Sequence, residues 1–213
     1  MMAIFIDSAI EADVRRAKEL GWIKGVSTSP ILLAKVVYSP EAALQRLVNV
    51  GLQPIFYQLI GTEEKDLVGE AEKVREILGE KLVLLMPPTE AGFKYMQTVG
   101  DEVPCGITAV FTPQQALVAR EAGAHYVMMH MAKAADGKND GVALVEIVAK
   151  SLAKSETELI VTGIKDAKSF VTAFNAGADH VSLPYRLLDE VIANEHTESL
   201  LEEFRMMGTR VRW

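Results

Sequence analysis

The stretch Ala119-Arg-Glu-Ala-Gly-Ala-His-Tyr-Val127 recurs further along the chain as Ala173-Phe-Asn-Ala-Gly-Ala-Asp-His-Val181. The two copies share the first alanine, the Ala-Gly-Ala centre and the final valine. In each copy a helical pattern ends at the glycine, the residue type that best accepts a left-handed backbone after a helix, and a β-rich run follows. The repeat therefore predicts related units in which a helix leads through a glycine turn into a strand.

Eight short apolar runs, rich in residues that favour strands, recur along the whole sequence. Segments with a helical apolar period separate them. Runs that are apolar on both faces and are joined through helices are typical of a parallel sheet covered on both sides. The expected strands are 3–7, 25–29, 54–60, 82–86, 106–111, 126–132, 159–164 and 180–184, and the expected helices include 41–50, 67–78, 113–122, 142–152, 166–176 and 185–193.

Eight units in 213 residues predict a single-domain α/β fold, the (β/α)8 TIM barrel. An open doubly wound sheet fits less well, because neither a Gly-x-Gly-x-x-Gly turn nor a Walker loop follows any of the runs. We expect the barrel to span residues 1–194. Residues 195–213 are expected to form an additional C-terminal helix, whose apolar stripe (Leu200, Leu201, Phe204 and Met207) would cover the barrel or a neighbouring subunit.

Charge and cysteine content argue against several classes of partner. The chain carries 22 basic and 29 acidic residues, a formal net charge of −7, which argues against binding to nucleic acid or an anionic membrane. The one cysteine, Cys105, excludes an intrachain disulfide framework and a thiolate zinc cluster, and it fits a reducing cytoplasm. The sequence shows neither a membrane-spanning apolar stretch nor a signal peptide. We therefore expect a soluble, cytoplasmic protein.

No metal or cofactor is expected from the motifs. The polar turn Asp136-Gly-Lys-Asn-Asp-Gly141 resembles a calcium loop only superficially, because the closing bidentate glutamate is missing. We interpret it as an ordinary loop.

Polar residues gather where the expected strands end, which is the face that carries the active site in barrels of this kind. Asp7 in an apolar run is costly unless it is paired or wet, so it is a candidate general acid or base; the alternative is a helix cap or an ion pair with a lysine. The full candidate set is Asp7, Ser27, Ser29, Gln58, Thr108, His130, Lys133, Gly163 and Lys165.

The other candidates each have a functional and a structural interpretation. Gln58 and Thr108 could orient a water or a substrate hydroxyl, or could pair within the barrel. His130 could shuttle protons near neutral pH, or could be a hydrogen-bonded core histidine among methionines. Lys133 and Lys165 could together hold a phosphate, or one could be an amine nucleophile; the alternative is a pair of solvated loop lysines.

The ordered series of motifs resembles the transaldolases, and within them the small fructose-6-phosphate aldolase-like branch. The resemblance covers essentially the whole chain. It is carried by Ile4-Phe-Ile-Asp7, Gly25-Val-Ser-Thr-Ser-Pro30, Phe56-Tyr-Gln58, Pro87-Pro-Thr-Glu-Ala-Gly92, Ile107-Thr-Ala-Val-Phe111, Ala122-Gly-Ala-His-Tyr-Val127 and Ser182-Leu-Pro184.

The resemblance implies a role in carbohydrate metabolism, in the pentose phosphate pathway, with a phosphorylated sugar as substrate and a homo-oligomer, a pentamer or decamer, as assembly. Enzymes of this family form a Schiff base through a lysine on the fourth strand, and that position here is Leu85. Asp7 matches the family's acid–base aspartate, and Gln58 and Thr108 match the residues that hold its catalytic water. Ser27 lies in the matching substrate-binding segment.

Other matching positions have changed. Ser29 stands where the family has a substrate-positioning asparagine, and His130 stands where the aldolase branch has a tyrosine. Lys133 stands at the phosphate-binding arginine, and Gly163-Ile-Lys165 stands at the Ser-x-Arg or Ser-x-Lys phosphate element.

Three hypotheses follow. The first is an aldolase or transaldolase whose amine has moved to Lys133 or Lys165. The second is a sugar-phosphate isomerase or epimerase that needs no imine, with Asp7 and His130 exchanging protons. The third is a non-catalytic relative that binds a sugar phosphate, which the apolar residue at position 85 favours.

Overall fold

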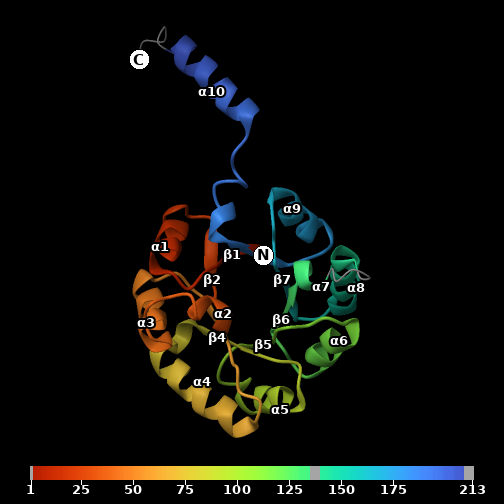
Figure 1. The fold of residues 1–213 in the computed structure, drawn as a ribbon. Helices are drawn as coiled ribbons and strands as arrows, with labels where there is room; N and C mark the ends of the chain where they lie inside the picture. Colours follow the sequence, from red (N-terminus) through yellow and green to blue (C-terminus); the bar gives the residue numbers. More distant parts are fainter. Residues whose placement is uncertain (1, 135–139, 209–213) are drawn as a thin grey trace.

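Eight parallel strands close into a barrel in the computed structural model, which describes residues 2–134 and 140–208. The strands follow one another around the barrel in chain order, with β8 pairing with β1 (Figure 1). This arrangement confirms the predicted (β/α)8 fold. The strands are β1 (Ala3–Asp7), β2 (Ile23–Ser27), β3 (Ile55–Gln58), β4 (Leu82–Met86), β5 (Cys105–Ile107), β6 (Tyr126–His130), β7 (Glu158–Thr162) and β8 (His180–Pro184).

Helices surround the barrel, and several of them have an N-cap residue whose side chain accepts a hydrogen bond from the first turn. Thr112 and Asp166 each form a reciprocal capping box with the third residue of the helix that follows, which satisfies backbone N–H groups that the helix leaves unpaired. The helices are α1 (Glu11–Glu19), α2 (Pro30–Leu33), α3 (Pro40–Val50), α4 (Glu64–Leu78), α5 (Glu90–Val99), α6 (Pro113–Glu121), α7 (Met131–Ala134), α8 (Gly141–Leu152), α9 (Ala167–Asn175) and α10 (Glu195–Gly208).

The repeated glycine turns have the backbone that the sequence predicts. Gly123 follows α6 with φ of 83°, and Gly177 follows α9 with φ of 101°, and both precede a strand of the barrel. A residue with a Cβ is strained in this region, so glycine is the suitable residue at both turns.

The expected helix over 185–193 is wrong. The segment begins as a single 3-10 turn, η2 (Tyr185–Leu187), and continues as turns up to residue 192. Its hydrogen bonds alternate in span, from Leu188 N to Tyr185 O and from Val191 N to Leu187 O. Leu187 and Leu188 are buried in the core outside the barrel, so the apolar residues that suggested a helix serve to pack this turn against the strands.

The polar turn 136–141 lies largely outside the described residues, as do positions 209–213 of the predicted tail helix. At its described end, Asp140 caps α8, because its carboxylate accepts a hydrogen bond from Val142 N at 2.9 Å.

The apolar residues form two cores, one on each side of the sheet. The larger core lies between the strands and the helices. The smaller core fills the inside of the barrel, where side chains from alternate positions of several strands meet. It consists of Phe5, Phe56, Val83, Leu85, Met128 and Ile160, with Ala3 and Tyr126 packed against it.

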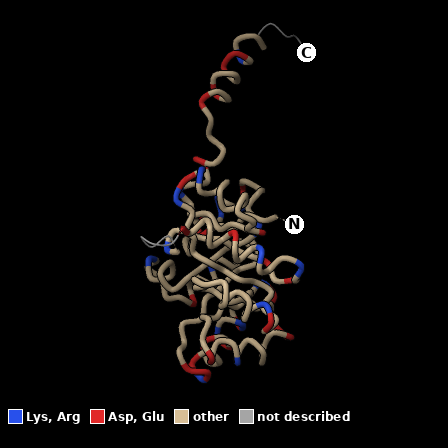
Figure 2. Tube along the Cα trace, turned by 90° about the vertical axis from the view of Figure 1, so that its right-hand side faces the viewer, with Lys and Arg blue, Asp and Glu red and all other residues tan. Residues whose placement is uncertain are grey.

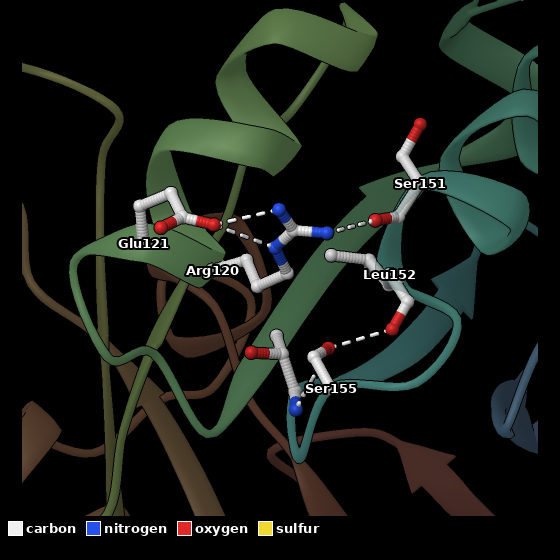
Figure 3. Close-up of polar contacts among 6 residues, drawn as sticks. Arg120, Glu121, Ser151, Leu152 and Ser155 are labelled. Atoms are coloured by element: carbon white, nitrogen blue, oxygen red, sulfur yellow. Dashed lines mark hydrogen bonds and ion pairs between the residues drawn. The ribbon is translucent and has the colours of Figure 1, made fainter.

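The outer surface carries charges of both signs, intermixed around the periphery (Figure 2). Some of them join neighbouring elements, as Figure 3 shows for the contact of α6 with the end of α8. Arg120 donates to Ser151 O at 2.7 Å and to Glu121 Oε1 at 2.6 and 3.0 Å. This arginine therefore bridges two helices on the outside of the barrel and does not line the cavity at the carboxyl ends of the strands.

Helix α10 stands away from the barrel in Figure 1, and all its residues are exposed. The apolar side chains of Leu200, Leu201, Phe204 and Met207 keep 46 to 65% of their surface accessible. None of the helices in the described part of the chain combines the length and the hydrophobicity needed to cross a bilayer.

Candidate active site

A cavity of about 580 Å³ opens at the carboxyl ends of the strands. Six strands or the segments directly after them contribute to its wall, and most of the predicted candidates meet there. Gly163 and Lys165 are outside the lining. The polar lining residues are Asp7, Ser27, Thr28, Ser29, Lys35, Gln58, Thr108, His130, Lys133 and Thr162.

Several polar side chains of this cavity have no hydrogen-bond partner among the residues that the structure describes. None of them is a fully buried, unpaired atom, so these groups reach the cavity and are available to a polar ligand or to water. Ser27 and Thr108 are only 3% and 6% exposed. The set consists of the side chains of Asp7, Ser27, Gln58, Thr108 and Thr162.

Asp7 ends β1 at the inner face of the barrel, two residues beyond the core residue Phe5. Burial raises the pKa of its carboxyl from 3.8 to about 6, and the positive charge of Lys35 partly offsets this effect. A carboxyl group with a pKa near 6 exchanges protons readily close to neutral pH, which suits a general acid or base.

His130 ends β6 and is half-buried in the cavity wall. Its Nδ1 atom accepts a hydrogen bond from Lys133 N at 3.2 Å. Burial lowers the pKa of the imidazole, and the charges of Lys133 and Lys165 lower it further. The ring is therefore neutral near pH 7, and because Nδ1 is the acceptor, Nε2 carries the proton as a hydrogen-bond donor.

Gly163 leaves the space that the His130 ring occupies. Its φ is 77°, and a Cβ built on it would overlap the Nδ1 and Cε1 atoms of His130. Any residue other than glycine at position 163 would thus require the imidazole to move. Gly163 is a packing partner of His130 and contributes no polar group to the cavity.

Leu85 lies inside the barrel core, with 1% of its surface exposed. It pairs with Gln58 on β3 and with Gly106 on β5, and its Cδ2 atom lies 3.0 Å from where a Cβ of Gly106 would be. The side chain belongs to the apolar layer beneath the cavity and has no group that could form an imine.

Lys133 and Lys165 are both exposed. Lys133 lies in the short helix α7 and lines the cavity, and Lys165 lies in the loop after β7. An amine nucleophile needs burial that favours its neutral form, and neither lysine has it. Both remain suitable as point charges for an anion near His130.

Ser29 is the N-cap residue of helix α2. Its hydroxyl accepts a hydrogen bond from Leu32 N at 3.3 Å and thereby caps α2, although Ser29 also lines the cavity. The neighbouring Thr28 donates to Phe56 O at 2.8 Å and is buried.

Ala109 is a strained residue in the cavity wall. Its φ is 56°, a left-handed conformation that costs a non-glycine residue roughly 1–2 kcal/mol. It follows the unpaired Thr108 directly. Strain of this kind concentrates at functional sites, where the surrounding fold compensates for it.

Lys35 is a further residue of the cavity that its sequence context does not reveal. This residue lies between α2 and α3, lines the cavity and acts on Asp7 electrostatically. The signal available was a single lysine within the apolar run 31–37, but the register of the loop after β2 is needed to place it at the cavity. Within the described residues, no cluster of three or more His, Cys, Asp or Glu side chains is arranged to hold a metal ion.

The fold and the cavity together define a class: a (β/α)8 barrel protein with a polar-lined cavity at the carboxyl ends of its strands. The sequence model described as Transaldolase/Fructose-6-phosphate aldolase matches residues 4–211. The chain belongs to this family.

Relatives with the name "Probable transaldolase" support the assignment along nearly the whole length. The protein of Coprothermobacter proteolyticus is 31% identical over 207 residues, which cover 95% of this chain and 94% of the relative. The protein of Nitrosopumilus maritimus is 28% identical over 207 residues, with coverages of 95% and 93%.

Solved structures agree with the fold. Mandelate oxidase in complex with (S)-2-phenylpropionate has a TM-score of 0.64 at 16% identity, covering 94% of this chain and 70% of its own. Mandelate oxidase with benzoyl-formic acid has a TM-score of 0.63 at 15% identity, with the same coverages. At these identities the likeness concerns the barrel architecture alone.

Proposed function

We propose that this protein binds a phosphorylated sugar at the barrel mouth and catalyses aldol cleavage or transfer on it without a lysine imine on β4. The observation that carries the proposal is the combination at one cavity of Asp7, with its raised pKa, and a neutral His130 above an apolar Leu85. Family membership supports the reaction class.

The reaction can be written with the groups present. The Asp7 carboxylate removes the proton of the substrate hydroxyl on the carbon that becomes the aldehyde, and the adjacent carbon–carbon bond breaks. The electron pair of that bond moves to the ketone, whose oxygen becomes an enolate oxygen and accepts a hydrogen bond from His130 Nε2–H. Protonation of the enediol carbon by the carboxylic acid of Asp7 completes the cleavage.

A second candidate function uses the same two groups. A carboxylate that moves a proton between neighbouring carbons, with a neutral histidine donating to the carbonyl oxygen, performs isomerisation or epimerisation. The neutral state of His130 serves this candidate as well as it serves the aldol reaction. The apolar layer around Leu85 favours a third outcome, a barrel that binds the sugar phosphate without turning it over.

A relocated imine is the alternative that the site supports least, because Lys133 and Lys165 are exposed. Borohydride reduction tests it directly: the protein is incubated with fructose 6-phosphate, dihydroxyacetone and glyceraldehyde 3-phosphate, reduced, and weighed intact and as peptides. We expect no covalent adduct. A sugar adduct on either lysine would replace our mechanism with imine chemistry.

The decisive assay follows fructose 6-phosphate by proton NMR in deuterated buffer. Release of dihydroxyacetone and glyceraldehyde 3-phosphate that is lost in Asp7→Asn supports cleavage. Deuterium uptake without release would support the isomerase. A ligand-induced rise in melting temperature without either would leave the binding function, and absence of all three would overturn the proposal.

We also propose a homo-oligomer, a pentamer or decamer, joined through residues 195–213. The apolar side chains of the α10 stripe, Leu200, Leu201, Phe204 and Met207, are all exposed, which indicates a surface that another subunit covers. Truncation after Asn194 followed by light scattering tests this proposal. We expect the assembly to have a lower mass, and an unchanged number of subunits would refute the role of residues 195–213 in joining them. The expected location is the cytoplasm, in keeping with a chain whose one cysteine, Cys105, is a free thiol.

A further inference from the structure

Two cationic side chains face the same cavity from opposite sides of the barrel. Lys35 follows β2 and α2, whereas Lys133 follows β6, and in a closed eight-stranded barrel β2 and β6 lie half a turn apart. Both lysines line the cavity. A ligand that spans the mouth therefore meets a positive charge at each end.

Neither ammonium group has a hydrogen-bond or ion-pair partner among the residues that the structure describes. In the part of the chain that the structure describes, Lys35 Nζ and Lys133 Nζ make no hydrogen bond or ion pair, whereas Lys18, Lys81 and Lys94 each bind an oxygen. The charge of Lys35 does act on the Asp7 carboxyl. Its head therefore carries its charge close to the acid–base group, and it is free to bind an anion there.

We propose that Lys35 forms a second anion site and that the cavity takes a carbonyl sugar with a phosphate at each end. This inference rests on the proposed function, and it places the first phosphate at Lys133, which lines the cavity. The cavity of about 580 Å³ lies within the usual range for small-ligand sites. The unpaired hydroxyl and amide groups of Ser27, Gln58 and Thr108, between the two lysines, suit the hydroxyls of the sugar.

Occupation of the Lys35 site has a consequence for Asp7. A phosphate on Lys35 neutralises the charge that now stabilises the Asp7 carboxylate, and it adds negative charge nearby. Both effects favour the protonated carboxyl, so binding of a bisphosphate takes up a proton near pH 6. A monophosphate held at Lys133 alone lacks this effect.

Isothermal titration calorimetry of the full chain tests the proposal with fructose 6-phosphate, fructose 1,6-bisphosphate and inorganic phosphate. We expect the bisphosphate to bind about 10-fold more tightly than the monophosphate, the effect of one additional charge-assisted contact. Lys35→Ala removes this preference, because the bisphosphate loses far more affinity than the monophosphate. Lys35→Arg retains it.

The matched control is Lys168→Ala. Lys168 is an exposed lysine on α9 outside the cavity, so its loss changes the net charge equally but leaves the preference intact. Titrations in two buffers of different ionisation enthalpy at pH 6 measure the proton uptake, which Lys35→Ala abolishes.

The outcomes separate the two proposals. If the monophosphate binds but the bisphosphate binds no more tightly, or if Lys35→Ala keeps the preference, the Lys35 site is refuted and the proposed function stands. If neither sugar binds, both proposals fall. If inorganic phosphate binds as tightly as the sugars, the lysines hold a free anion only, and the sugar-spanning geometry is refuted.

Discussion

Replacing Gly163 by alanine tests how the His130 side of the cavity is built. A Cβ at this position overlaps the imidazole ring, and the backbone has φ of 77°. The left-handed conformation costs an alanine roughly 1–2 kcal/mol, and forcing an extra carbon into a packed site costs about 1–3 kcal/mol more. We expect Gly163→Ala to lower the free energy of unfolding by about 2–5 kcal/mol in urea denaturation followed by circular dichroism.

The chain offers a matched control in Gly21. Its φ is also 77°, but a Cβ there meets no atom within 4 Å. Gly21→Ala therefore has the conformational cost alone, about 1–2 kcal/mol. In the double variant Gly163→Ala/His130→Ala the overlap is gone, so we expect a favourable coupling energy of about 1–3 kcal/mol. Equal losses for the two glycine variants, or no coupling with His130, would refute the reasoning.

Three further perturbations test the rest of the site and the barrel core. The folded-state pKa of Asp7 is raised from 3.8 to about 6, so the wild type loses stability as pH rises through this window. Asp7→Asn has no carboxyl group to ionise and does not lose this stability. We therefore expect the stability of Asp7→Asn relative to wild type to grow by up to about 3 kcal/mol between pH 4 and 7 in urea denaturation. Leu85→Lys restores an amine on β4, and we expect borohydride to trap dihydroxyacetone on residue 85; the absence of any adduct would mean that the cavity no longer admits the family's intermediate. Ser182 is fully buried, and its hydroxyl has no partner among the described residues, so Ser182→Ala should raise the free energy of unfolding by about 1 kcal/mol. Thr28→Val removes a hydroxyl that is paired with Phe56 O and should lower the free energy of unfolding by about the same amount. A loss of stability in both variants would contradict this assignment.

The barrel could be predicted from sequence because its units repeat a pattern that local physics enforces. Strands 3–7, 82–86 and 180–184 have the expected bounds, since a clear apolar run ends at a polar residue or a proline in each. The second strand was expected at 25–29 and lies at Ile23–Ser27, because Ser29 turns to cap α2. In sequence, a Ser-Pro pair at the end of a strand cannot be told from a Ser-Pro pair that starts a helix. Only the hydrogen bond that the serine hydroxyl accepts from the helix distinguishes the two cases.

The site could be predicted in part. Asp7, Gln58, Thr108 and His130 interrupt apolar runs near strand ends, and the barrel brings such positions to one cavity whatever the details of packing. The role of Gly163 could not be predicted, because it depends on a contact with a ring on the neighbouring strand. Lys35 could not be placed either, since its loop is positioned by tertiary packing after a helix of only four residues.

The apolar side chain of Leu85 has a consequence for the reaction proposed at the barrel mouth. The family resemblance implies that a lysine imine receives the electron pair of the breaking bond. In the imine-free reaction proposed above, the carbonyl oxygen of the substrate receives it instead, because Leu85 lies in the apolar core and carries no amine. An oxyanion needs donors that are already in place, and removal of one such donor commonly lowers the rate 100- to 1,000-fold. For the reaction proposed above this requirement falls on His130, whose N–H is held ready by the Lys133 backbone and whose ring fits only because residue 163 is glycine. In the proposed reaction, His130 would thus do the work of the amine, and Gly163 would provide the space for its ring.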